Sequence, residues 1–191
     1  MTTRLAIARW ISIAGHPFSF IALLVVVAGS KRYGFGGAAR LITVTAIVLI
    51  IPLWIFMWRK WRSGHWQTVD ASDPRDRPSF YGAAFLLLGL LMGCFALVEG
   101  WSFMLRGSAA VAVLLGLAAI LNRWIKLSNH VAFAMFTGAL LSRFAVGWGL
   151  GVLVLVPFVA WSRLALSRHA SHEVLGGMVL GALVGAVAAW A

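Results

Sequence analysis

The chain has 191 residues, of which 62% are hydrophobic and only 11% are charged, and its formal net charge is +11. Soluble domains carry about a quarter charged residues, so this composition excludes an ordinary water-soluble domain. The Lys and Arg residues are scattered between apolar runs. This distribution favours anchors at a lipid headgroup layer over a nucleic-acid surface.

Uncharged runs recur along the chain, and a membrane-spanning helix needs about 20 mainly apolar residues. In chain order these runs are 10–30, 41–58, 78–98, 107–122, 127–142, 144–162 and 174–191. The alternation typical of a transmembrane strand is absent, so the spans are expected to be helices. The sequence therefore predicts one all-α integral membrane domain over residues 1–191, a multi-pass bundle of six or seven helices in the cell membrane.

The last apolar run has a regular pattern of glycines. Gly177, Gly181 and Gly185 recur every four residues, which places them on one face of a helix. Small residues at this spacing allow a second helix to approach closely in lipid. We expect this face to pack against a helix of the same chain or to support a homo-oligomer.

Three polar clusters lie between the apolar runs, at 59–77, 126–130 and 162–173. Two apolar runs separate each cluster from the next, and an even number of crossings returns a chain to the same side of the membrane. The three clusters are therefore predicted to meet at one membrane face. The count of Lys and Arg on the two sides leaves the identity of that face open.

The side chains of these clusters suit phosphate chemistry. Guanidinium groups bind phosphate oxygens in a bidentate manner, and two histidines allow one nucleophile or base and one acid. The candidates are Arg75, Arg77, Lys126, Ser128, His130, Arg163, His169 and Glu173. No spacing typical of a metal site or of a nucleotide-binding loop occurs, so no metal and no cofactor are expected.

The order and spacing of these residues resemble the type-2 phosphatidic acid phosphatase family, which includes lipid phosphate phosphatases. Its third motif is Ser-Arg, five residues, His, three residues, Asp, and here Ser162-Arg163 is followed by His169 and Glu173 at those spacings. Its second motif, Pro-Ser-Gly-His, corresponds to "LSNH" at 127–130. Its first motif, Lys, six residues, Arg-Pro, corresponds to Asp70 and Arg77-Pro78, with aspartate at the lysine position.

The resemblance implies a phosphatase core at about 70–190 that removes phosphate from a lipid phosphate or a prenyl diphosphate. His169 would form a phosphohistidine, Glu173 would orient its ring, and His130 would protonate the leaving lipid oxygen. The phosphoryl oxygens would be bound by Arg77, Arg163 and Ser128. We expect Arg75 or Lys126 to supply the cation that the motif has lost at Asp70.

Other interpretations of the same residues remain open. Loss of the lysine also fits a lipid-phosphate binder with little or no turnover. A lipid or small-molecule transporter is a third possibility, although such proteins usually place their polar site near the middle of the bilayer. The arginines and aspartates at 70–77 also fit a surface network of ion pairs.

Overall fold

The computed structural model describes residues 3–190, and over that range the chain forms helices and no strands. In chain order they are α1 (Thr3–Ala14), α2 (Pro17–Thr45), the π-helical segment η1 (Ala46–Ile50), α3 (Ile51–Arg62), α4 (Arg77–Leu97), α5 (Ser102–Leu121), α6 (Asn129–Phe144), α7 (Val146–Ala165) and α8 (Ser171–Trp190). Five helical segments are long and apolar enough to cross a membrane, with α2, η1 and α3 counted as one. The predicted all-α, membrane-embedded character is thus confirmed.

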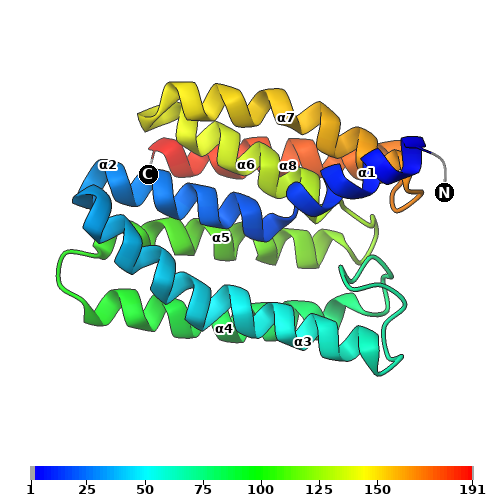
Figure 1. Ribbon diagram of the computed structural model, residues 1–191, viewed down its shortest axis with the longest axis horizontal. Helices are drawn as coiled ribbons and strands as arrows, with labels where there is room; N and C mark the ends of the chain where they lie inside the picture. Colours follow the sequence, from blue (N-terminus) through cyan, green and yellow to red (C-terminus); the bar gives the residue numbers. More distant parts are fainter. Residues whose placement is uncertain (1–2, 191) are drawn as a thin grey trace.

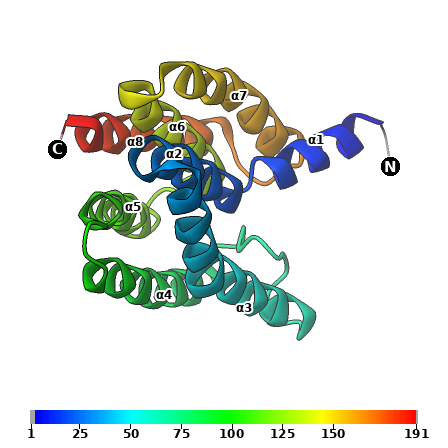
Figure 2. The same ribbon diagram turned by 60° about the vertical axis from the view of Figure 1, so that its left-hand side comes forward.

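The predicted apolar run at 10–30 is divided between two helices. α1 ends at Ala14, and α2 begins at Pro17, whose missing N–H is tolerated in a first helical turn. The His16 side chain caps α2, because its Nδ1 accepts a hydrogen bond from the Phe18 amide at 3.2 Å. α1 instead packs beside the end of α7 and projects beyond the bundle (Figure 2).

α2 turns back on itself at Gly34, where φ is +70°, a value that favours glycine. Figure 1 shows the chain crossing the bundle in one direction through the first part of α2 and returning through α3. The two arms approach closely, because a Cβ built at Gly29 would lie 3.1 Å from the Ala38 Cα. The Tyr33 hydroxyl fixes this bend by donating to the Gly100 carbonyl at 2.8 Å.

The helices form two groups with the first part of α2 between them. One group contains α6, α7 and α8, and the other contains α3, α4 and α5 (Figure 2). α6 packs most extensively against α7 and α8, and most of its residues are buried. A helix that is apolar on nearly all sides suits this central position.

The glycine face of α8 packs against α6 within the chain, as one of the two sequence interpretations predicted. A Cβ at Gly177 would lie 2.7 Å from the Ser128 carbonyl oxygen, and one at Gly185 would lie 2.9 Å from the Phe136 carbonyl oxygen. Gly181 lies against Ala132 in the same way. The close approach of α6 explains the glycine spacing within one chain.

The polar connections meet at one end of the bundle. Segments 63–76, 122–128 and 166–170 lie together on the right of Figure 1, next to the junction of α1 and α2. The bend of α2 and the connection between α4 and α5 lie at the opposite end. The even number of crossings between the predicted clusters accounts for this arrangement.

Candidate active site

Hydrogen bonds between the three connections assemble a polar cluster. The Arg163 Nη2 donates to the Asp70 Oδ2 at 2.7 Å, and the His169 Nδ1 lies 3.2 Å from the Lys126 carbonyl oxygen. The Ser128 amide donates to the Glu173 carbonyl oxygen at 3.2 Å. We call the following residues the polar cluster: His16, Asp70, Arg77, Ser128, His130, Arg163, His169 and Glu173.

His169 and Glu173 form the part of the cluster that is best arranged for chemistry. The His169 Nδ1, in the connection before α8, lies 2.9 Å from the Glu173 Oε2 in the first turn of that helix. The same oxygen accepts from the Ala170 amide at 3.1 Å, which holds the carboxylate at the start of α8. Glu173 therefore reaches the histidine although the resembled motif has the shorter aspartate.

Burial keeps the His169 ring neutral. Desolvation, with Arg163 and Arg77 nearby, lowers the pKa of His169 to about 4, against the opposing effect of Glu173. At neutral pH an Nδ1–H donated to Glu173 leaves the Nε2 lone pair free, as a nucleophile requires. Such a histidine–carboxylate pair has the arrangement of an oriented nucleophile or general base.

Arg163, at the end of α7, is only 2% exposed and already has protein partners. Its Nη1 donates to the Ser12 Oγ at 2.7 Å, and its Nη2 also contacts the Ser72 Oγ at 3.1 Å. Ser12 comes from α1 and Ser72 from the connection before α4, so Arg163 joins three distant parts of the chain. Neither serine was predicted, because nothing in the local sequence shows that these segments meet.

Asp70 is the acidic partner of Arg163. Its Oδ1 accepts from the Ser72 Oγ at 2.6 Å. Burial alone would raise the pKa of the Asp70 carboxyl, but Arg163, His130 and the Ser72 hydroxyl outweigh burial and hold that pKa well below its usual range. The position that carries lysine in the resembled motif thus holds a permanent negative charge.

Arg77 and Ser128 bring the other predicted phosphate ligands into the cluster. The Arg77 Nη1 donates to the Leu127 carbonyl oxygen at 3.0 Å and to the Asn122 Oδ1. Three buried atoms of the predicted ligands find no hydrogen-bond partner within residues 3–190: the Arg77 Nε, the Arg163 Nε and the Ser128 Oγ. Buried polar atoms are normally paired, so a bound group rich in oxygen atoms would satisfy them.

Two histidines from different segments also lie together. The rings of His130 and His16 are 5.1 Å apart and nearly perpendicular. His130, which was predicted to protonate the leaving oxygen, lies in the first turn of α6. His16 was not predicted as a site residue, and burial lowers its pKa to about 4. The only sequence signal for His16 was its place before the proline that starts α2.

The two residues expected to replace the motif lysine are engaged elsewhere. The Arg75 side chain is 79% exposed and pairs with Asp73 at 2.9 Å. Hydrogen bonds from Arg75 lower the pKa of Asp73 to about 2. The Lys126 Nζ donates to the Arg168 carbonyl oxygen at 2.9 Å. The structure therefore does not bring either cation into contact with the polar cluster.

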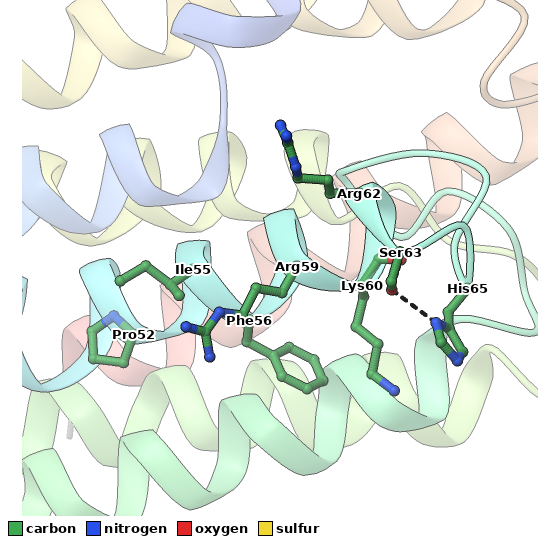
Figure 3. Close-up of a pocket in the computed structure, with 8 residues that line it drawn as sticks. All are labelled: Pro52, Ile55, Phe56, Arg59, Lys60, Arg62, Ser63 and His65. Carbon is green, nitrogen blue, oxygen red and sulfur yellow. Dashed lines mark hydrogen bonds between the residues drawn. The ribbon is translucent and has the colours of Figure 1, made fainter.

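Two cavities lie outside the polar cluster. One, of about 820 Å³, follows α3 and is lined by the residues drawn in Figure 3, where the Ser63 Oγ and the His65 Nδ1 lie 2.8 Å apart. The other, of about 750 Å³, lies among α2, α4, α5, α6 and α8 and includes Arg106 and Arg143. Neither is lined by a cluster residue, so the candidate chemistry and these cavities are separate.

The side chains of the polar cluster also indicate which kind of ligand it can hold. Within residues 3–190, no group of three or more His, Cys, Asp or Glu side chains is arranged to hold a metal ion. The buried arginines and the His169–Glu173 pair instead suit an anionic ligand.

Comparison with known proteins gives no relative: no family model, curated protein or solved structure matches the chain.

Proposed function

We propose that the chain is a metal-independent lipid phosphatase of the cell membrane that acts through a phosphohistidine. The hydrogen bond between His169 and Glu173 is the observation that carries this proposal. A neutral, oriented imidazole next to two buried guanidinium groups is the arrangement that nucleophilic attack on phosphorus needs. Its substrate would be a lipid phosphate or a prenyl diphosphate, because the surrounding helices are apolar.

In the first step the His169 Nε2 attacks the phosphorus and the bond to the lipid oxygen breaks. His130 passes a proton to that oxygen, so that a neutral alcohol leaves. In the second step water attacks the phosphohistidine, which releases phosphate and restores His169. Glu173 holds the imidazole in one orientation and stabilises its positive charge in the intermediate.

The phosphoryl oxygens would be held by Arg77, Arg163 and Ser128. Each of these three residues has a buried atom that lacks a partner, and an unsatisfied buried donor costs about 1–3 kcal/mol. A bound phosphoryl group would remove that cost and would place charge where the guanidinium groups stabilise it. All three side chains are at most 5% exposed, so a ligand reaches them only if covering side chains move.

One contact favours a second candidate function, a lipid-phosphate binder without turnover. Asp70 forms an ion pair with Arg163, so this guanidinium group has less charge to offer a transition state than a free one. A site of this kind would bind phosphate but accelerate its transfer weakly. The two functions differ in whether a covalent intermediate forms.

Phosphate release from a panel of lipid phosphates in detergent, with EDTA present, tests the proposal. The wild type should release phosphate, and His169→Ala should reduce release by at least about a thousandfold. Rapid quenching followed by mass spectrometry should find a phosphoryl group on His169. Phosphate release that persists in His169→Ala would overturn the mechanism, and saturable binding without release would establish the binder.

A further inference from the structure

The polar cluster has an unusual charge balance for a site that takes an anion. The guanidinium groups of Arg77 and Arg163 are matched by the carboxylates of Asp70 and Glu173. The position that the resembled motif reserves for a third cation holds one of these carboxylates instead. The cluster is therefore close to neutral, unless its histidines carry charge.

The histidines add no charge near neutral pH. The pKa values of His16 and His169 are both lowered to about 4, mainly because the rings are buried. His130 lies against His16, 5% exposed, where a charge would be both desolvated and repelled by Arg163. The ionisable groups whose charges act on Asp70 are His16, which precedes α2, Arg77 of α4, His130 of α6 and Arg163 of α7. Arg168 acts on Arg163 from the connection before α8 and is not part of the polar cluster.

A nearly neutral buried site distinguishes between ligands of different charge. A phosphomonoester loses its second proton at a pH of roughly 6 and then carries two negative charges. Each buried charge without a counter-charge costs several kcal/mol of desolvation. The second charge of a dianion would also be repelled by the Asp70 carboxylate, which shares Arg163 with the ligand.

We propose that Asp70 makes the polar cluster selective for the singly charged, protonated form of a phosphomonoester over its dianion. This inference rests on the proposed function and names the form of substrate that the same site uses. Asp70 acts through Arg163 and through its own charge, as a specificity-determining residue.

The singly charged form also supplies the proton that the reaction needs. Its P–OH proton passes through neutral His130 to the leaving lipid oxygen while the His169 Nε2 forms the bond to phosphorus. The products of this step are a neutral alcohol and a phosphohistidine with net charge −1, equal to the charge of the substrate. Water then yields singly charged inorganic phosphate, so no external acid is required.

Binding to the His169→Ala variant tests the inference without turnover. The ligands are dodecyl phosphate, whose charge changes from mostly −1 at about pH 5 to mostly −2 at about pH 7.5, and methyl dodecyl phosphate, which carries −1 at both values. The affinity for the monoester, divided by that for the diester, should fall at least about tenfold between the two pH values. In the double variant His169→Ala with Asp70→Asn, this ratio should fall by less than about threefold between the two pH values.

Asp73→Asn is the matched control, because Asp73 lies in the same connection but pairs with exposed Arg75. It should leave the pH dependence of the ratio unchanged. An affinity ratio that does not fall with pH, or that Asp70→Asn leaves unaltered, overturns the inference. Charge-selective binding with no phosphate release by the wild type at either pH would instead refute the proposed phosphatase and leave the selectivity standing.

Discussion

Two arginine–aspartate pairs in this molecule share their chemistry and differ in the burial of the arginine. Arg163 and Asp70 lie 2.7 Å apart, as Arg75 and Asp73 do at 2.9 Å, and both aspartates belong to the connection between α3 and α4. Arg163 is 2% exposed, whereas Arg75 is 79% exposed. Burial removes the screening by water that weakens the exposed pair, so the same contact has a much larger effect at Arg163.

The largest expected effect comes from breaking the buried pair. Arg163→Gln should reduce phosphate release by at least about a thousandfold, because it removes a guanidinium group from the phosphoryl site. It should also destabilise the protein by about 1–3 kcal/mol, since Asp70, whose side chain is 19% exposed, loses its charged partner. Turnover and thermal unfolding in the same detergent measure the two effects.

A double variant separates the two effects of Arg163→Gln. Arg163→Gln combined with Asp70→Asn removes both charges, so it should recover most of the lost stability while turnover stays low. Equal melting temperatures for the single and the double variant would contradict the assignment of Asp70 as the buried partner.

A smaller effect is expected at the hydrogen bond between His169 and Glu173. Glu173→Gln keeps a hydrogen-bond acceptor for the His169 Nδ1–H but loses the negative charge that stabilises the imidazolium of the intermediate. We expect kcat to fall by roughly 10- to 100-fold with little change in KM.

Glu173→Asp tests the length of that side chain directly. The shorter carboxylate keeps its charge but gives up part of the 2.9 Å contact with His169, so kcat should fall by about tenfold or less. Activity of Glu173→Asp above that of the wild type would show that the longer residue is not needed for reach.

Features that depend on residues near one another in the chain are predicted well from the sequence. The apolar runs and the even number of crossings predict the helices and the end of the bundle where the clusters meet. The spacing from Ser162 to Glu173 indicates the contact of His169 with its carboxylate, because the two residues are only four positions apart at the start of α8. Such features depend on residues that are near in the chain.

The choice of cation partners depends on residues that are far apart in the chain. Arg75 and Asp70 lie in one short connection, and only packing of that connection against α7 decides which of them reaches the polar cluster. The contacts of Ser12 and His16 with Arg163 and His130 likewise depend on how α1 and α2 sit at the end of the bundle. No local pattern encodes them.

A moderate effect of pH on stability should come from the buried histidines and not from either aspartate. The pKa values of His16 and His169 are about 4 in the folded chain, against about 6.5 in an unfolded one. As pH falls from about 6.5 to about 4, the unfolded chain takes up protons that the folded chain does not, so stability falls over this range.

Melting temperatures between about pH 7 and pH 4.5 measure this loss. His16→Gln and His169→Gln should each make the dependence on pH shallower, because each removes one titrating group. Asp73→Asn should change it little, because this carboxyl takes up protons mainly below about pH 4.5 in the unfolded chain and at still lower pH in the folded one. An unchanged slope in both histidine variants would contradict the buried, neutral state of these rings.

The smallest effect is expected at the exposed pair. Arg75→Ala should change phosphate release by less than about twofold and leave the melting temperature nearly unchanged, because most of this side chain lies in water and salt screens its charge. Raising the salt concentration should weaken the Arg75–Asp73 contact further without altering turnover. A strong loss of turnover in Arg75→Ala would mean that Arg75 leaves Asp73 and enters the polar cluster when substrate binds. The motif lysine would then have a replacement, the cluster would gain a positive charge in the bound state, and the selectivity assigned to Asp70 would disappear with it.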